Sequence, residues 1–252
     1  MAESFGSDPE GYDRARPSYP DGLIARIVAA SPGHEVLDVG CGTGIAGRQL
    51  QAAGCEVRGV EPDARMAEFA TSRGLPVEVA RFETWDAAGR RFDTVTAAQS
   101  WHWIDPEAGA AKAADVLRPG GLLAIFGHVF EPPIEVAEPF AAALRRVLPD
   151  SPFAAMPARR PLTTYEALYA KVGDSLRASG RYREPELWRF DWTCRYTRDE
   201  WLALLPTTGG LTRVPAEPLA EILNEVGAAI DGLGGAFTME YTTLATAAVT
   251  RG

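Results

Sequence analysis

Ten residues near the start of the chain, Glu35 to Gly44, constrain the fold more than any other stretch. Their sequence, Glu-Val-Leu-Asp-Val-Gly-Cys-Gly-Thr-Gly, begins with the apolar, β-branched pattern of a short buried strand. The glycines that follow have no Cβ, so the backbone can turn sharply and a ligand can approach its peptide groups directly. A helix is expected next, from Thr43 to about Ala53. A strand, a glycine turn and a helix in this order predict a ligand site at the turn.

Asp38 places a carboxylate near the end of this otherwise apolar strand. That charge would repel a pyrophosphate, whereas it would attract a ligand with an ammonium and a sulfonium, such as S-adenosylmethionine. The turn alone leaves the choice open, because residues 42–47 also satisfy the GxGxxG spacing of dinucleotide sites. The position of Asp38 and the lack of a Tyr-x-x-x-Lys pair favour S-adenosylmethionine over NAD. A P-loop is excluded because no Gly-Lys-Ser/Thr follows.

Apolar strands alternate with helices along the first half of the chain. Further strands are expected at 56–60, 76–82, 92–98 and 122–126, with helices at 63–73 and 106–117, and two last strands at 187–196 and 237–250. Short connections between such elements predict a doubly wound α/β fold, a mostly parallel seven-stranded sheet with helices on both faces. Ligands bind such sheets at the carboxyl ends of the strands. Glu61, Glu83 and the segment from Gln99 to Asp105 fall at that edge, beside the glycine turn.

The chain divides into four expected regions. They are an N-terminal flap and first helix at 1–30, a ligand-binding core at 31–130, an inserted helical cap at 131–186, and C-terminal strands and helices at 187–252 that complete the core. Residues 1–21 are expected to have little regular structure, as a flexible terminus or as a flap over the ligand. The cap is inferred because the strand alternation stops after Gly127 and proline, alanine and arginine become frequent.

Composition limits the classes of partner. The net charge of −9 and an isoelectric point near 5.0 argue against a nucleic-acid or anionic-membrane partner. Three scattered cysteines are too few for a disulfide framework or a zinc site. The three histidines, His34, His102 and His128, are far apart in the chain, so no metal site is expected. No signal-like start and no long apolar run occur, and a soluble cytoplasmic protein is therefore expected.

With these residues in view, the chain resembles the class I S-adenosylmethionine-dependent methyltransferases. Residues 36–44 are similar to the first motif of that family, and Leu-Arg-Pro-Gly-Gly at 117–121 looks like the turn into its fifth strand. Tyr-Asp-x-x-Arg-Pro-x-Tyr-Pro at 12–20 and Ser-Trp-His-Trp at 100–103 resemble a small-molecule branch that includes trans-aconitate methyltransferase-like proteins. Members of that branch act on varied substrates, so the likeness indicates the cofactor better than the acceptor.

The resemblance implies a role for each residue of the predicted site. The methionine part would be bordered by Asp38 (close to its ammonium), Gly40, Cys41, Gly42 and Gly44, and the ribose would be held by Glu61. The adenine would be contacted by Pro62, Met66, Phe82 and Glu83. The sulfonium side would be flanked by Gln99, Ser100 and Trp101, and the site would be closed by Tyr12, Arg16 and Tyr19. The acceptor is expected beside Trp101, His102 and Trp103. An aromatic face near a sulfonium is also a favourable cation–π contact.

His102 is the candidate catalytic residue. It could act as a general base for an oxygen acceptor, because an unperturbed imidazole titrates near neutrality, or it could simply pack in the pocket wall. Methyl transfer from a sulfonium is a direct displacement, so positioning alone can supply much of the rate. The predicted function is methylation of a small molecule, with an acid or hydroxyl favoured. The alternatives are an NAD(P)-dependent oxidoreductase and a non-catalytic S-adenosylmethionine-binding protein, and the oligomeric state stays open.

Overall fold

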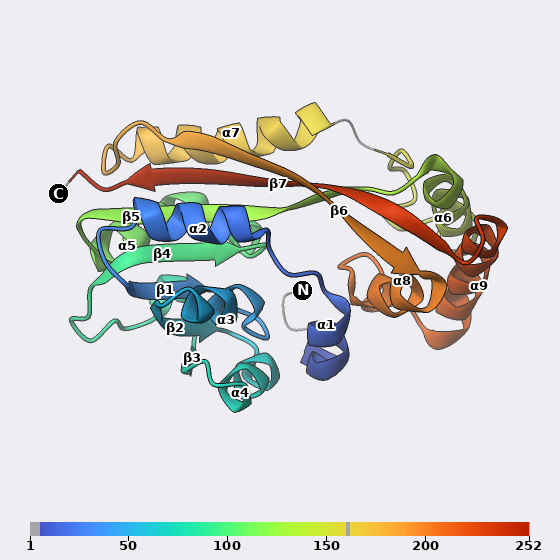
Figure 1. Cartoon of the computed structure of the whole chain (residues 1–252), viewed down its shortest axis with the longest axis horizontal. Coiled ribbons are helices and arrows are strands. Elements are labelled where there is room, and N and C mark those ends of the chain that lie inside the picture. The colour runs from blue at the N-terminus through green and yellow to red at the C-terminus, as the bar shows by residue number, and fades with distance from the viewer. Residues whose placement is uncertain (1–5, 160–161, 252) are drawn as a thin grey trace.

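The computed structural model describes residues 6–159 and 162–251. The first five residues of the expected flap, Arg160 and Pro161 of the expected cap, and Gly252 lie outside the described residues. Within the described residues the strands form one seven-stranded sheet in the order β3-β2-β1-β4-β5-β7-β6 (Figure 1). The first five strands in this order are parallel, and β7 is antiparallel to both of its neighbours. The predicted doubly wound, mostly parallel α/β fold is confirmed.

The order of elements follows the predicted alternation through the first half of the chain. The strands are β1 (Glu35–Val39), β2 (Glu56–Glu61), β3 (Val77–Val79), β4 (Phe92–Ala98), β5 (Leu117–Glu131), β6 (Glu186–Thr197) and β7 (Ala236–Val249). The helices are α1 (Pro9–Ala15), α2 (Asp21–Ala30), α3 (Ile45–Ala52), α4 (Ala64–Ser72), α5 (Pro106–Val116), α6 (Ile134–Val147), α7 (Leu162–Ala178), α8 (Arg198–Leu204) and α9 (Ala216–Gly232), with short 3₁₀ turns η2 (Phe82–Thr84), η3 (Trp101–Trp103) and η4 (Leu205–Thr207). In this described part, no helix has the length and apolar character needed to cross a membrane.

Two hydrophobic clusters lie on the two faces of the sheet. Along β1 the side chains alternate, so that Val36 belongs to one cluster while Leu37 and Val39 belong to the other. Helices α2, α3 and α4 cover the Val36 face, and α5 and α7 cover the Leu37 face. Both faces of the parallel strands are thereby buried, which explains their almost continuous apolar sequence.

Three strands run on past the core into a second lobe. β5, β7 and β6 have 15, 14 and 12 residues, against 5 for β1, and their far ends pack with α6, α8 and α9 (Figure 1). This lobe corrects the expected division of the chain. Its helices come both from the expected cap and from the region that was expected to complete the core. Helix α7, expected in the cap, instead packs on β7 and α5, because its apolar side chains, such as Leu176, enter the core.

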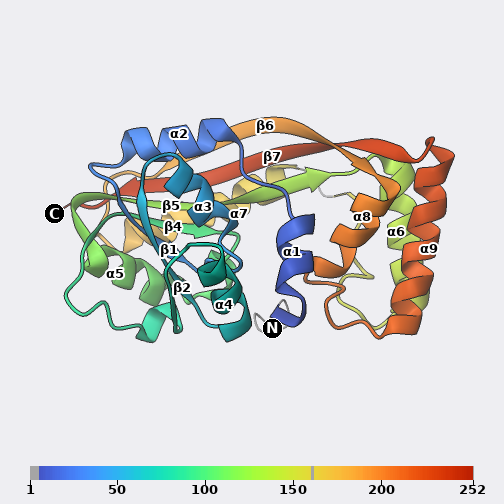
Figure 2. The ribbon, with the colours of Figure 1, turned by 60° about the horizontal axis from the view of Figure 1, so that its bottom comes forward.

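The N-terminal segment contains a helix where little regular structure was expected. Asp8 caps α1 by accepting a hydrogen bond from the backbone N–H of Gly11 at 2.9 Å, and Pro9 occupies the first turn, where a missing N–H costs nothing. The helix contacts α4 of the core and α8 of the lobe, and it lies between these two parts in Figure 2. That prediction is therefore wrong for residues 9–15, which form one wall between core and lobe.

Candidate functional site

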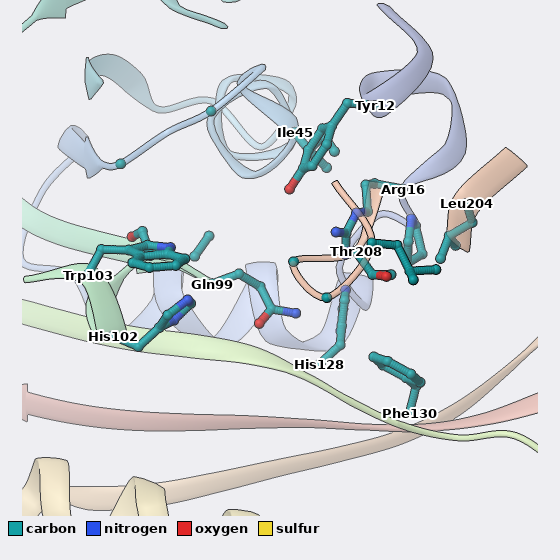
Figure 3. A pocket seen from close by; sticks show the side chains of 18 of the residues that line it. Tyr12, Arg16, Ile45, Gln99, His102, Trp103, His128, Phe130, Leu204 and Thr208 are labelled. Atoms are coloured by element: carbon teal, nitrogen blue, oxygen red, sulfur yellow. The ribbon is translucent and has the colours of Figure 1, made fainter. Parts of the chain in front are cut away.

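A cavity of about 850 Å³ opens at the carboxyl ends of the parallel strands. Its walls come from the glycine turn after β1, the ends of β2, β4 and β5, helix α1, and the lobe (Figure 3). Because α1 and the lobe stand on the far side of the strand ends, the cavity has a core half and a lobe half. The predicted edge of the sheet is thus the place where this cavity is found.

The glycine turn exposes its backbone to the core half of the cavity. Gly40 and Gly42 have φ angles of +63° and +56°, in the left-handed region that favours glycine. A Cβ on Gly40 would come within 2.5 Å of the Ser100 Cβ, whereas a Cβ on Gly42 would meet nothing within 4 Å. Gly40, Cys41 and Gly42 line the cavity, so a ligand can lie directly against these peptide groups. Gly44 is the N-cap of α3 and stays outside the lining.

Glu61 is the carboxylate on the cavity wall. Its Oε2 accepts a hydrogen bond from the Gly42 N–H at 2.9 Å, and its Oε1 accepts one from the Asp63 N–H, also at 2.9 Å. The side chain is 7% exposed, and burial raises its pKa above the usual glutamate value. Each carboxylate oxygen retains a second acceptor site. Two ribose hydroxyls would satisfy those sites, so the residues present fit the nucleoside part of S-adenosylmethionine.

Asp38 lies behind the glycine turn, and its predicted place close to a ligand ammonium stays a prediction. The Thr96 hydroxyl donates to Oδ1 at 2.9 Å, while Oδ2 has no hydrogen-bond partner among the described residues, although the nearby Gly47 backbone amide lowers the pKa slightly. The side chain is fully buried and does not line the cavity. Burial raises its pKa to about 7. At neutral pH the carboxylate is therefore only about half ionised, and it acts on a ligand only at a distance.

The remaining nucleoside positions lie together beyond Glu61. Pro62 and Met66, at the start of α4, line the cavity with Phe82 and Glu83 of η2. Met66 and Phe82 are almost completely buried, so each presents only one apolar surface to the hollow. An adenine ring could rest between such surfaces. The structure thus brings the four predicted adenine residues to one end of the core half.

The loop after β4 holds Gln99 in an unusual backbone conformation. Its φ is +57°, a left-handed value that strains any residue with a Cβ, and its N–H donates to the Phe126 carbonyl at 2.8 Å. The side chain points into the middle of the cavity in Figure 3. Ser100 donates from its hydroxyl to the Val39 carbonyl at 2.5 Å and lines the same region. Strain tolerated at a cavity wall is typical of a functional position.

The three residues of η3 have different environments. Trp101 is 7% exposed, packs in the core against the backbone of Gly109, and does not line the cavity, which corrects its predicted contacts with cofactor and substrate. His102 and Trp103 do line it, with ring centroids 4.7 Å apart. Partial burial lowers the pKa of His102, so its ring is neutral at pH 7. Among the described residues, no protein group hydrogen-bonds to that ring.

The three predicted flap residues surround the opening from the α1 side. Tyr12, Arg16 and Tyr19 all line the cavity. The Arg16 guanidinium lies 4.9 Å from the centroid of the Tyr12 ring and donates to the Thr207 carbonyl of the lobe at 2.5 Å. Tyr19 is buried, and its backbone and the Gln49 side chain exchange two hydrogen bonds of 2.8 Å. Arg16 thus ties α1 to the lobe, while Tyr19 ties the following segment to α3.

His128 is a cavity residue that sequence reasoning missed. It follows Gly127 on β5, where the strand was expected to have ended, and continued alternation with Val129 and Phe130 was the available signal. Its ring stacks on Tyr19 with centroids 4.5 Å apart, and Nδ1 lies 2.9 Å from the Thr243 hydroxyl oxygen. Burial, with a smaller contribution from the Arg16 charge, lowers its pKa to about 3. His128 therefore stays neutral and does not exchange protons near pH 7.

The sequence did not predict the lobe half of the cavity either, and the lining of this half is mostly apolar. The residues that share this character are Phe130, Val136, Phe140, Ala141, Leu144, Phe153, Met156, Trp201, Leu204, Leu205 and Leu211. They come from β5, α6, the segment after it, α8 and η4, which lie far apart in sequence. No single stretch of the chain carries a signal for a wall assembled in this way. In the parts of the chain that the structure describes, no group of three or more His, Cys, Asp or Glu residues could hold a metal ion.

Comparison with known proteins agrees with this geometry. A family model described as a methyltransferase domain matches residues 36–121. An uncharacterized methyltransferase of Mycobacterium tuberculosis is 38% identical over 128 residues, which is 50% of this chain and 52% of the relative. A ubiquinone biosynthesis O-methyltransferase of Methylobacterium nodulans is 37% identical over 95 residues, 34% of this chain and 38% of the relative. The chain therefore spans about half the length, or less, of these curated relatives.

A solved structure extends the likeness to almost the whole chain. The structure of a putative type II methyltransferase from Anaeromyxobacter dehalogenans superposes with a TM-score of 0.63 at 25% identity, covering 92% of this chain and 97% of that one. The match includes both the core and the lobe, whereas the family model covers only the core. The core of the chain, residues 36–121, therefore matches a methyltransferase domain, and the chain as a whole is similar in fold to that solved structure.

Proposed function

We propose that this chain transfers the methyl group of S-adenosylmethionine to a small-molecule acceptor held in the lobe half of the cavity. The observation that carries the proposal is Glu61, a buried carboxylate fixed to the Gly42 N–H with acceptor sites left toward the hollow. The bare peptide of Gly42 gives the methionine part a surface to lie on. A nucleoside held at both points would direct its methionine end toward Gln99 and the lobe.

The chain's own part in the reaction is mainly one of positioning. The cofactor supplies an electrophilic methyl group on a sulfonium, and direct displacement needs donor and acceptor in line. Gln99 lies in the middle of the cavity in Figure 3, between Trp103 on one side and Leu204 of the lobe on the other. An acceptor lodged in the lobe half would approach through this region. The apolar walls exclude water from the same space, which strengthens the polar contacts within it.

Oxygen is the favoured accepting atom. A relative with 37% identity over 95 residues is named as an O-methyltransferase, which supports an oxygen acceptor. His102 has a pKa below the usual histidine value and lines the cavity beside Trp103. A neutral imidazole there could take the proton of a hydroxyl acceptor, whereas an ionised carboxylate acceptor would need no base. The similarity to trans-aconitate methyltransferase-like proteins stays a prediction.

Calorimetric titration of the full chain tests the proposal against its alternatives. Binding of S-adenosylhomocysteine without binding of NAD or NADP is the expected result, and the reverse would establish an oxidoreductase instead. Mass-spectrometric assay of S-adenosylmethionine with a panel of phenols, acids and amines then tests transfer itself. Cofactor binding with no product from any acceptor in the panel would favour a non-catalytic binding protein.

A further inference from the structure

The cavity is large for a small-molecule site. Its volume of about 850 Å³ lies near the upper end of the roughly 300–1,000 Å³ typical of single small-molecule sites. The predicted cofactor residues that line it belong to the core half or to the N-terminal segment 12–19, of which Arg16 also faces the lobe half. The lobe half is therefore left for the acceptor, and its chemistry reports on what the acceptor is.

The walls of the lobe half are aromatic and aliphatic. Phe130, Phe140, Phe153, Trp201, Leu204 and Leu205 all line it. Such a surface gains most from a partner that removes it from water, because the gain scales with the apolar area buried. A strongly charged acceptor would have to give up its hydration here without comparable polar contacts in return.

Large exposed apolar side chains gather at this cavity. Trp103, Phe130 and Phe153 are 41%, 44% and 39% exposed, and all three line it. Phe153 also rests on the backbone of Gly210, where an added Cβ would come within 3.2 Å of its ring. Exposed aromatic surface around one hollow, with polar residues at its rim, is typical of a binding site for an apolar ligand.

The aromatic wall is held in place from behind. The Tyr241 ring stacks on Trp192 with centroids 4.3 Å apart and planes 9° from parallel, and its hydroxyl lies 2.8 Å from that of Tyr196. Phe130 makes ring contacts with Tyr241 and Trp201 at centroid distances of 6.3 and 6.4 Å. A wall fixed by such contacts keeps its shape before the ligand arrives, so less order must be imposed on binding.

Few charges face the lobe half. Among its described residues the arginines are Arg16 and Arg159, and the latter is paired with Glu131 at 3.2 Å. Arg16 is the cation left to interact with an acceptor, and its Nε is buried with no hydrogen-bond partner in the described chain. One acidic or electron-rich oxygen could be accommodated beside it. Several carboxylates could not all be paired.

From this wall and from Arg16, the cation of the lobe half with no carboxylate partner among the described residues, we infer that the acceptor has a bulky apolar body and at most one acidic group. This inference rests on the proposed function, because it names the class of acceptor for the same site. It separates the chain from enzymes whose acceptor is a small polycarboxylate. Phe130 and Phe153 are then the residues that determine specificity for the apolar body.

Two probes of opposite character test the inference on the full chain saturated with S-adenosylhomocysteine. We expect 2-naphthoate to bind at least tenfold more tightly than trans-aconitate by isothermal titration calorimetry. Phe130→Ala and Phe153→Ala should each weaken naphthoate binding about five- to tenfold. The matched control is Leu187→Ala, which removes a side chain that is 49% exposed on β6 outside the cavity and should change neither affinity.

The outcomes separate this inference from the proposed function. If S-adenosylhomocysteine binds but trans-aconitate binds more tightly than naphthoate, only the inference on the acceptor is overturned. It is also overturned if naphthoate binds equally well to the wild-type chain and both phenylalanine variants. If S-adenosylhomocysteine itself does not bind, the proposed function fails first. The affinity of both phenylalanine variants for S-adenosylhomocysteine should be within twofold of wild type. This affinity and the thermal unfolding of each variant show that it is folded.

Discussion

The two halves of the cavity are built in different ways. The core half comes from short connections between neighbouring elements, and its main contacts are backbone groups of the glycine turn and the Glu61 carboxylate. The lobe half comes from side chains on β5, α6, α8 and η4. Backbone groups are the same whatever the side chains, so the first kind of wall suits a ligand that does not vary. The second kind can change with each substitution, which suits recognition of a particular acceptor.

The largest expected effect is on the core half. Glu61→Gln should weaken S-adenosylhomocysteine binding roughly 100- to 1,000-fold, because hydrogen bonds to a charged group contribute about 1.5–3 kcal/mol each. Calorimetry measures the change. Glu56→Gln, the same substitution at the exposed start of the same strand, is the control and should bind normally. Equal affinity in the two variants would contradict the assignment of Glu61 to the ribose.

His102→Ala tests whether the junction between the halves contains a base. With a phenolic acceptor, kcat should fall about 100-fold, the lower end of the range for general base catalysis. With a carboxylic acid acceptor it should change less than threefold. His34→Ala, at the opposite edge of the sheet, is the control. An equal fall for both acceptors would indicate a role in packing or orientation instead of proton removal.

The affinity for S-adenosylmethionine should depend on pH through Asp38. Its pKa of about 7 in the free protein means that it is mostly protonated at pH 6 and mostly ionised at pH 8. A cationic ligand nearby favours the ionised form, so binding releases a proton, and affinity should fall about tenfold from pH 8 to pH 6. Titrations in two buffers of different ionisation enthalpy measure that proton. Asp38→Asn should remove the dependence, and a slope that persists in this variant would assign it to another group.

The smallest effect concerns the strained backbone at the junction. Gln99→Gly should raise the free energy of unfolding by about 0.5–1 kcal/mol, because a left-handed φ costs a residue with a Cβ about 1–2 kcal/mol and glycine gives part of that back in chain entropy. The adjacent Ala98→Gly, within β4, should lower it by a similar amount. Urea unfolding measures the free energy of unfolding of both variants and of the wild-type chain. Equal destabilisation by both would mean that Gln99 is not strained.

The same contrast explains what could be predicted from the sequence. The sheet, the glycine turn and the position of Glu61 follow from local patterns, since spacing and strand order decide them. The lobe could not be predicted in this way, because Trp201 and Phe130 meet only after two long strands have paired. Helix α7 was misplaced for a related reason: an amphipathic pattern shows that one face is buried but not against which surface.

Single residues near the site show where local reasoning ends. Trp101 and Trp103 are the same type of residue and are separated only by His102. Trp101 nevertheless lies in the core, whereas Trp103 faces the cavity. The η3 turn decides this, and no periodicity marks it in so short a segment. Asp38 was correctly placed at the strand end but faces α3, because strand alternation puts it on the same face as Val36. Its charge at neutral pH depends on that burial.

The continuous path of β5, β6 and β7 has a consequence for motion. The floor beneath donor and acceptor is one hydrogen-bonded sheet, with β5 and β7 paired from Leu122–Val249 to Glu131–Glu240. A hinge between core and lobe would have to break this ladder. The opposite wall contains α1, whose Asp13 is paired with Arg48 of the core at 2.6 Å, while Arg16 just after it donates to the Thr207 carbonyl of the lobe. The sheet that fixes the spacing of the two halves of the cavity is therefore a different part of the molecule from the short helix that forms the opposite wall.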